Sequence, residues 1–328
     1  MVWDAAGVTR KVILDVDTGT DDAVAIMLAA LHPGLDLAAV TTVNGNVPLP
    51  ATTDNTLRVL DAIGRPDVPV HPGVAHPIAR RGFPGQTHFK RDSDRDMHGT
   101  SLPLPAPVTA ARDTSAVEFL LHTLRDTTEP VTLVPVGPLS TIATVLAADP
   151  SVRDAVDEIV IMGGAHAYGN VTPSAEFNIW ADPEAAAMVF SAGFPRLTLV
   201  PLDATHQALV TRADCAKLAE LGTAAGRAAA DLITRRIDAY SAGHGVHAAD
   251  SAPVHDAVCV AYLVRPEVIT TRPVRVEVET AGALTVGRTV MDVRPNATGE
   301  PNAQVAFQAR AEVLVDLLLT TFGEAGQR

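Results

Sequence analysis

The stretch "KVILDVDTGTDDAVAIMLAALHPG" (residues 11–34) joins an apolar run to an apolar helical pattern through four aspartates within eight positions. We predict a buried strand over residues 11–17 and a helix over 22–31. Carboxylates this close repel one another unless a positive charge lies among them. Two explanations are open: the acids cap the N-terminus of the helix, or they bind a cation.

The same alternation of β-branched apolar runs with helical patterns continues beyond residue 34. It predicts one α/β domain over residues 1–328, with a doubly wound, mostly parallel sheet and helices on both faces. The strictly alternating run at 274–280 predicts a more exposed strand. The other predicted strands are 37–43, 131–136, 158–164 and 196–203. The other predicted helices are 52–64, 139–148, one beginning near Asp182, and more than one within about 211–241.

Two segments, 72–110 and 242–254, show neither the strand period nor the helix period of apolar residues. We expect residues 1–10 to be a disordered N-terminus. We expect residues 72–110 and 242–254 to form active-site loops, because long loops in compact domains commonly carry function.

The composition narrows the class of partner. The chain has 328 residues and a formal net charge of −13 without a basic block, which argues against nucleic acid or an anionic membrane as partner. It has no apolar run near the ~20 residues of a membrane span, and its start lacks an apolar signal-peptide core. The two cysteines, Cys215 and Cys259, suggest no disulfide framework. We therefore expect a soluble, cytoplasmic protein.

Polar residues and glycines follow the predicted strands where each strand ends, the edge at which open α/β sheets bind ligands. Capping explains acids at the helix start, but it does not explain Asp17 at the strand end. A strand end followed by a helix N-terminus would aim Asp17 and Asp22 at one point, and such oxygen ligands suit Ca²⁺ or Mg²⁺. The other residues at these strand ends are Asn44, Asn46, Gly137, Gly163, Gly164 and Asp203.

Two other cation motifs fit less well. An EF-hand loop needs Glu at its twelfth position, where this chain has Ile26 or Leu28. The haloacid-dehalogenase phosphatase pattern also begins with Asp-x-Asp at a strand end, but it requires Thr or Val where Gly19 stands. A Mg²⁺-dependent phosphatase is therefore the weaker alternative.

A second polar stretch, "GNVTPSAEFNIWADPEAA" (169–186), holds Asn170, Glu176 and Asn178. Amides and a carboxylate that converge on one point suit a ligand rich in hydroxyls, since each hydroxyl both donates and accepts. The alternative is an ordered loop that uses Asn in its turns.

A third stretch, "SAPVHDAVCVAYLV" (251–264), places His255 and Asp256 at the start of a predicted helix, where capping is again the alternative. His255 with His244 and His247 would suggest zinc, but their spacing matches no zinc motif.

Together these pieces resemble the nucleoside hydrolase family, of the inosine-uridine preferring or ribonucleoside hydrolase type. The motifs occur in family order from residue 11 to about 264, and the Asp-rich opening, the Asn/Glu/Asn segment and the His-Asp pair are the most specific. They are "DVDTGTDDAVAIMLA" (15–29), "TTVNGN" (41–46), "VGPLSTIA" (136–143), "IMGGA" (161–165), "GNVTPSAEFNIWADPEAA" (169–186) and "PVHDAV" (253–258).

The resemblance implies a site built around one Ca²⁺ that binds a ribonucleoside. The implied protein ligands are Asp17, Asp22, Asp256 and the backbone carbonyl of Val136, and a water and two ribose hydroxyls would complete the roughly 6–8 oxygens that Ca²⁺ prefers. The implied substrate contacts are Asp21 and Asn178 at the 2′ and 3′ hydroxyls, Asn170 and Glu176 at the 5′ end, Asn46 at the ribose, Met162 along the sugar pocket, and His255 toward the base.

The implied reaction is hydrolysis of the N-glycosidic bond to free ribose and a nucleobase. Asp17 would be the general base for the calcium-bound water, and the ribosyl group would pass through an oxocarbenium-like state. His255 is the leading candidate for the acid that protonates the leaving base. His98, Tyr240 and His244 are further candidates for a contribution to this step, and His98 is also a candidate for contact with the substrate.

Some residues depart from the family pattern. Thr18 stands where the family usually has Pro, and "LST" (139–141) replaces Leu-Thr-Asn. The run "GTSLPLP", which opens the segment 99–107, replaces an acidic, glycine-rich continuation, so the base preference and the role of this segment stay open. A catalytically silent nucleoside-binding or sugar-binding protein is another alternative, although the intact Asp17 argues against it. The resemblance also implies a homodimer or homotetramer.

Overall fold

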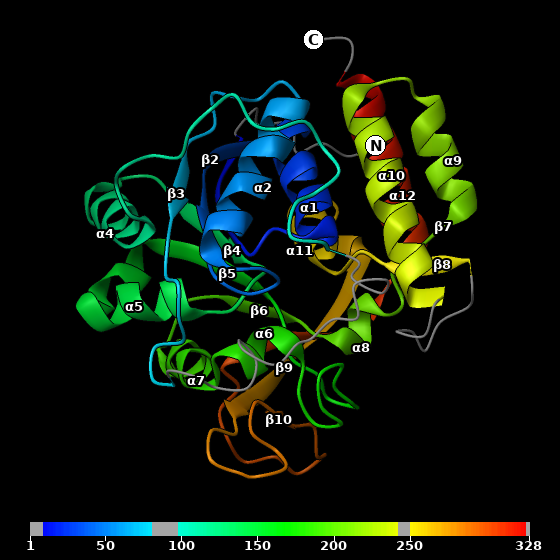
Figure 1. Ribbon diagram of the computed structural model, residues 1–328. Coiled ribbons are helices and arrows are strands. Elements are labelled where there is room, and N and C mark those ends of the chain that lie inside the picture. Colours follow the sequence, from blue (N-terminus) through cyan, green and yellow to red (C-terminus); the bar gives the residue numbers. More distant parts are fainter. Residues whose placement is uncertain (1–8, 81–97, 242–249, 326–328) are drawn as a thin grey trace.

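The computed structural model describes residues 9–80, 98–241 and 250–325 (Figure 1). Its main strands are β1 Arg10–Val16, β2 Leu35–Thr42, β3 Val70–Pro72, β4 Val131–Pro135, β5 Val156–Met162, β6 Leu197–Val200, β9 Ile269–Val278, β10 Thr289–Asp292 and β11 Ala303–Ala309. Within the described residues these nine strands form one sheet in the order β10-β9-β11-β6-β5-β4-β1-β2-β3. Neighbours from β11 to β3 are parallel, while β9 is antiparallel to both β11 and β10.

Helices cover both faces of this sheet. The longer ones are α1 Thr20–Leu31, α2 Leu49–Ala62, α4 Ala116–Asp126, α5 Ser140–Ala148, α7 Pro183–Ser191, α9 Arg212–Glu220, α10 Ala224–Ala239, α11 His255–Val264 and α12 Ala311–Glu324. Figure 1 shows α4, α5 and α7 across the sheet from α10 and α12. Leu14 of β1 belongs to the core beneath α1, α2 and α9–α12, whereas Ile13 belongs to the core beneath α4, α5 and α7. Successive residues of a strand face opposite sides of the sheet, so Leu14 and Ile13 lie in different cores. Helices therefore pack on both faces, and the predicted doubly wound arrangement is confirmed.

Helix α1 lies inside the molecule, and all its residues from Thr20 to Ala30 are buried. A helix that is apolar around its whole circumference has to be covered on every side, and α2, α10, α11 and α12 pack against it. The carboxylate of Asp22 accepts a hydrogen bond from the backbone N–H of Gly19 at 2.8 Å and so caps the first turn. The opening stretch therefore forms the strand, glycine turn and helix that it predicts.

The strand predicted over residues 196–203 is too long. Strand β6 ends at Val200, and the next residue is Pro201, which has no N–H to donate to the sheet. The short helix α8 (Leu202–Thr205) follows, so Asp203 lies in a helix rather than at a strand end. Its carboxylate accepts hydrogen bonds from the backbone N–H groups of His166 and Ala167.

The predicted terminus and loops need further correction. Arg10 lies in β1 rather than in a disordered N-terminus, and residues 1–8 are outside the described part of the chain. Beyond Pro72, the described part of 72–110 contains neither helix nor strand. The end of 242–254 is not a loop, because β8 (Ser251–Pro253) pairs with β7 (Leu209–Thr211). Among the helices that the structure describes, none has the length and apolar character needed to cross a bilayer.

Candidate active site

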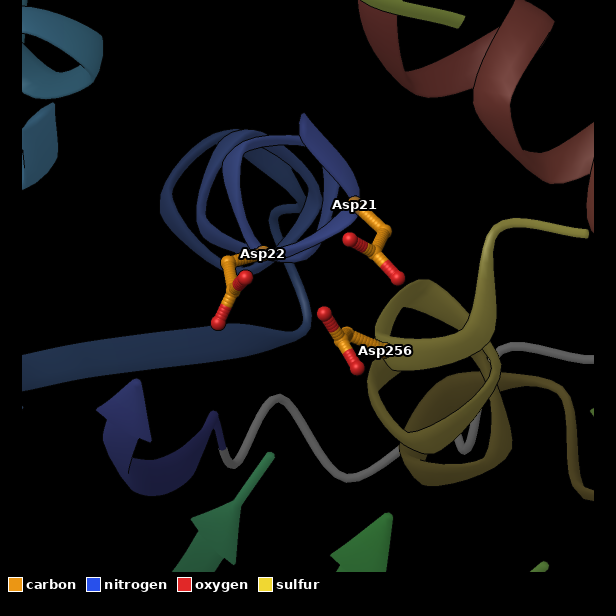
Figure 2. A group of neighbouring side chains, drawn as sticks. All are labelled: Asp21, Asp22 and Asp256. Carbon is orange, nitrogen blue, oxygen red and sulfur yellow. The ribbon is translucent and has the colours of Figure 1, made fainter. Parts of the chain in front are cut away.

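Segments far apart in the sequence meet beyond the carboxyl ends of the parallel strands. They are the turn between β1 and α1, the turn between β8 and α11, and the segment from the end of β5 to the short helix α6 (Phe177–Ala181). Figure 2 shows acidic side chains at the starts of α1 and α11 turned toward one another. This is the edge of the sheet at which a ligand is expected.

Asp17 directly follows β1 and is 1% exposed. Its Oδ2 accepts a hydrogen bond from the backbone N–H of Asn46 at 2.6 Å. Two glycines leave room for it, since a Cβ on Gly45 would lie 2.1 Å from Oδ2 and a Cβ on Gly137 would lie 2.9 Å from Oδ1. The backbone after β2 and β4 therefore closes around this carboxylate and fixes its direction.

Asp22 both caps a helix and belongs to an acidic cluster. Besides Gly19, the backbone N–H of Asp17 donates to its carboxylate at 3.1 Å, and the side-chain amide of Asn46 donates at 3.3 Å. Burial, followed by the charge of Asp21, still raises the pKa of Asp22 to about 7. Burial and then the charge of Asp22 likewise hold the pKa of Asp17 well above its usual range. Capping therefore does not compensate for the charge at this site.

The carboxylates of Asp21, Asp22 and Asp256 come together from α1 and α11 (Figure 2). One oxygen from each lies within 4.8 Å of the other two. Burial, and then repulsion from Asp21, Asp22 and Asp17, raises the pKa of Asp256. Buried carboxylates that repel one another would be stabilised by a divalent cation. These residues therefore fit a metal ion, and the closest group includes Asp21 in place of Asp17.

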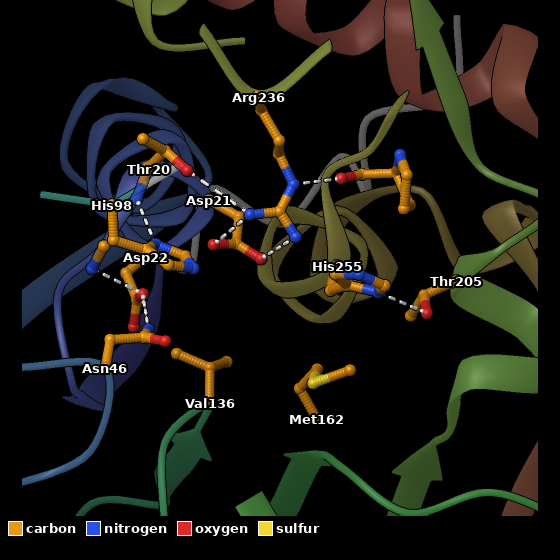
Figure 3. Close-up of polar contacts among 12 residues, drawn as sticks. Thr20, Asp21, Asp22, Asn46, His98, Val136, Met162, Thr205, Arg236 and His255 are labelled. Carbon is orange, nitrogen blue, oxygen red and sulfur yellow. Dashed lines mark hydrogen bonds and ion pairs between the residues drawn. The ribbon is translucent and has the colours of Figure 1, made fainter. Parts of the chain in front are cut away.

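Arg236 of α10 is a site residue that the sequence analysis missed. It is 3% exposed, and its guanidinium pairs with both carboxylate oxygens of Asp21 at 2.9 Å (Figure 3). The spacing of Leu232, Ile233, Arg236 and Tyr240 places all four on one side of the helix. An arginine within an apolar stripe of a helix was the available signal.

Asn178 lies in the first turn of α6 and is 5% exposed. Its Nδ2 donates to the backbone carbonyl of Val136 at 2.7 Å and to that of Met162 at 3.1 Å. The structure therefore brings these three residues together at the ends of β4 and β5. The carbonyl of Val136, which the resemblance assigns to the metal, accepts a hydrogen bond from the amide of Asn178 here.

Glu176 and Asn170 have different surroundings. Glu176 is 2% exposed, its Oε1 accepts from the backbone N–H of Asn178 at 2.9 Å, and its Oε2 accepts from that of Gly164 at 2.8 Å. Burial raises its pKa to about 7. Asn170 is exposed, and its Oδ1 accepts from the backbone N–H of Phe177 at 3.0 Å. This contact joins the two ends of the loop between residues 170 and 177.

His255 is 4% exposed, and both of its ring nitrogens are engaged. Nδ1 lies 2.7 Å from Oγ1 of Thr205, and Nε2 lies 3.1 Å from the hydroxyl of Tyr240. Tyr240, a further candidate for a part in leaving-group protonation, therefore contacts the predicted acid directly. His244 and His247, which the zinc alternative requires, lie outside the described residues.

His98 lies against the turn that precedes α1 and is 7% exposed. Its Nδ1 accepts a hydrogen bond from the backbone N–H of Thr20 at 3.2 Å. A Cβ on Gly19 would lie only 2.0 Å from Nδ1, so a side chain at position 19 would displace the ring of His98. The described start of the 98–110 segment therefore contacts the start of α1.

Sequence comparison assigns this arrangement to a family. Residues 12–316 match the family of inosine-uridine preferring nucleoside hydrolases. The chain belongs to this family. It is therefore an enzyme, a nucleoside hydrolase, as its motifs predict.

Individual relatives agree with this assignment. The chain is 41% identical over 284 residues to the pyrimidine-specific ribonucleoside hydrolase RihB of Escherichia coli (strain SE11). The aligned region covers 86% of this chain and 87% of that protein. It is 30% identical to the solved purine-preferring ribonucleoside hydrolase from Gardnerella vaginalis, with a TM-score of 0.84 over 97% of this chain and 99% of that one. For the plant nucleoside hydrolase PpNRh1 the identity is also 30%, with a TM-score of 0.83 and coverage of 95% and 98%.

In this nucleoside hydrolase the segment 99–107 is anchored on α2. The backbone N–H of Leu102, which is 2% exposed, donates to Oδ1 of Asn55 at 2.9 Å. The amide of Asn55 also donates to the carbonyl of Thr18 at 3.1 Å, and the hydroxyls of Thr18 and Thr56 lie 2.7 Å apart. Asn55 therefore joins the segment to the turn that carries the aspartates, a role that the sequence did not reveal.

Proposed function

We propose that this nucleoside hydrolase is a Ca²⁺-dependent ribonucleoside hydrolase that releases free ribose and a nucleobase. The observation that carries the proposal is the buried group of Asp21, Asp22 and Asp256 beside Asp17, at the sheet edge where ligands bind. The ribonucleoside substrate is supported by the names of the relatives, two of which are ribonucleoside hydrolases.

The proposed cation ligands are Asp17, Asp22, Asp256 and the carbonyl of Val136. Each offers oxygen alone, the donor type for which Ca²⁺ and Mg²⁺ are suited. When bound, the cation would supply positive charge that lowers the pKa of the attacking water. It would also let carboxylates whose pKa values are raised by burial and repulsion ionise near neutral pH.

Asp17 is the proposed general base, which takes a proton from the attacking water. Asp17 must be ionised to accept that proton, and a cation bound beside it would favour the ionised form. The hydrogen bond from Asn46 and the close backbone at Gly45 and Gly137 hold it in place. A base fixed in this way needs little reorganisation when the proton moves.

The sugar is proposed to lie between Asp21 and Asn178. A carboxylate accepts hydrogen bonds from hydroxyls, and an amide can both donate and accept. Departure of the base leaves positive charge on the ribosyl group, and the acidic residues around it favour that charge. The other proposed sugar contacts are Asn46, Met162, and, toward the 5′ end, Asn170 and Glu176.

His255 is the proposed acid for the leaving base. The hydroxyls of Thr205 and Tyr240 contact its two ring nitrogens and hold the ring in one orientation. The proposed route runs from Nε2 of His255 through the hydroxyl of Tyr240, which takes up that proton as it gives its own to the base, so that the base leaves as a neutral molecule rather than as an anion. His98, beside the turn that precedes α1, is proposed as a further substrate contact.

A panel of uridine, cytidine, inosine, adenosine and guanosine, assayed for free reducing sugar, tests this function. We expect sugar release that stops with a strong chelator and returns with Ca²⁺. The panel also establishes the base preference, since the relatives include pyrimidine-specific and purine-preferring enzymes. Binding without sugar release would support the silent binder, and release of phosphate from phosphate esters would support the phosphatase.

Asp17→Asn tests the base. We expect the folded variant to lose at least about a thousandfold in kcat. Asp126→Asn, on the exposed surface of α4, is the matched control and should keep the activity. Near-normal turnover by Asp17→Asn would remove Asp17 as the base.

We also propose that the enzyme is a homodimer or homotetramer and that it is cytoplasmic. Light scattering tests the oligomeric state, and cell fractionation tests the location.

A further inference from the structure

Arg236 is a buried cation that the mechanism above does not use. Its Nη1 lies 2.9 Å from Oδ1 of Asp21 and its Nη2 lies 2.9 Å from Oδ2, so the pair is bidentate. Both side chains are almost fully buried, with exposures of 3% and 7%. A planar guanidinium matches a carboxylate in this geometry, and an ammonium group does not.

The other donors of Arg236 connect two sides of the site. Nε donates to the carbonyl of Pro253 at 2.6 Å, two residues before His255, and Nη1 also lies 3.3 Å from the hydroxyl of Thr20. The guanidinium carbon lies 5.5 Å from the ring centre of Tyr240. Arg236 therefore contacts the start of α1 and the turn before α11 at the same time (Figure 3).

This pairing separates Asp21 from the other acids of the cluster. Both oxygens of Asp21 face the guanidinium, whereas Asp22 accepts hydrogen bonds from backbone N–H groups and an amide. An ionised carboxylate has about four lone-pair positions, so a bidentate arginine leaves two for other donors. Hydroxyl groups of a sugar are donors of the right kind. Asp21 is therefore suited to a hydroxyl, with its direction fixed by Arg236.

We propose that Arg236 is a positioning residue that holds Asp21 toward the 2′-hydroxyl of the ribose and so sets the preference for ribonucleosides over 2′-deoxyribonucleosides. This inference rests on the proposed function. A site built to accept a hydrogen bond from a hydroxyl discriminates strongly against an analogue that lacks it. That discrimination requires a fixed acceptor, because a mobile carboxylate can turn away when the hydroxyl is missing.

Arg236→Lys tests the proposal, since it keeps the charge and loses the bidentate geometry. The substrates are the best ribonucleoside of the panel and its 2′-deoxy counterpart. We expect kcat/KM for the ribonucleoside to fall by about 10- to 100-fold and that for the deoxynucleoside to fall much less, so the preference narrows by about 10-fold or more. Arg227→Lys, at an exposed position of the same helix, should change neither value.

A double-mutant cycle with Asp21→Asn shows whether Arg236 acts through Asp21. If it does, adding Arg236→Lys to Asp21→Asn should cost less than about twofold in kcat/KM, because residues that act as a unit are not additive. Should Arg236→Lys not fold, the uncharged pair Asp21→Asn with Arg236→Gln replaces it. We expect that pair to match Asp21→Asn alone in activity and in substrate preference.

The outcomes separate this inference from the proposed function. A wild type that hydrolyses no nucleoside overturns both. An active wild type with equal losses on both substrates in Arg236→Lys, or with multiplied losses in the double variant, overturns only the role of Arg236. In that case Arg236 stabilises the fold without directing Asp21.

Discussion

Replacing Glu176 by Gln should change how the stability of this nucleoside hydrolase depends on pH. Glu176 is 2% exposed, and its carboxylate accepts hydrogen bonds from the backbone N–H groups of Gly164, Asn178 and Ile179. Burial raises its pKa from the ordinary 4.5 to about 7. The folded protein therefore holds a proton that the unfolded chain releases. The resulting stabilisation is complete below pH 4.5 and is lost as the pH rises through about 7.

The difference between these two pKa values corresponds to about 3 kcal/mol in the free energy of unfolding. About 1.4 kcal/mol of this stabilisation should be lost between about pH 6 and pH 8.5. Both of these pH values lie above the pI of 5.2. Glutamine does not titrate, so the variant should lack this part of the pH dependence. The NH₂ group of the glutamine side chain would also face a backbone N–H group, and both are donors. This should cost about 1–3 kcal/mol in the free energy of unfolding at every pH.

Urea unfolding of the wild type and Glu176→Gln at about pH 6, 7 and 8.5, with chelator in all samples, measures the effect. The difference between the two proteins cancels the acids that they share, and it should shrink with rising pH. Glu118→Gln is the control, because a hydrogen bond from Ser115 lowers the pKa of that exposed residue and its difference should not shrink in this window. A Glu176 difference that stays constant from about pH 6 to pH 8.5 would refute the reasoning.

Three further outcomes follow from the site. Calorimetry should show that Asp22→Asn weakens Ca²⁺ binding by at least about 100-fold, whereas Asp21→Asn weakens it by less than about 10-fold. Equal losses in the two variants would mean that both residues bind the metal. Gly45→Ala should lower kcat by about 100-fold, because its Cβ would lie 2.1 Å from Oδ2 of Asp17, and unchanged kcat would show that this carboxylate can move without cost. His255→Ala should slow natural nucleosides more than p-nitrophenyl riboside, whose leaving group needs no proton, and equal losses would argue against an acid role.

The fold was predictable where its signals are local. The strand and helix of residues 11–34 follow from an apolar run, a glycine turn and a capping acid, all within one short stretch. The pair β7–β8 was not predictable, because strands of three residues carry no readable period and their pairing joins Thr211 to Ser251 across α9 and α10. Pro201, by contrast, was a readable signal against continuing a strand to residue 203.

The site was predictable in its residue types and less so in its contacts. Acids at a strand end and at two helix starts indicate oxygen chemistry, and the structure brings Asp22 and Asp256 together. The partner of each side chain depends on how distant elements pack, which no local pattern contains. The pairing of Arg236 with Asp21 requires α10 to lie beside α1. The sequence therefore revealed the acidic residues of the site, but it did not reveal the arginine that pairs with Asp21.

The charges of the site explain why Arg236 matters. Burial and mutual repulsion raise the pKa values of Asp17, Asp22 and Asp256, so these acids resist ionisation together. Arg236 compensates for one carboxylate, that of Asp21. Four carboxylates, one guanidinium and one divalent cation would leave a single net negative charge beside the sugar. A positive charge that develops on the ribosyl group would be stabilised by that excess in a buried site, where charges are weakly screened.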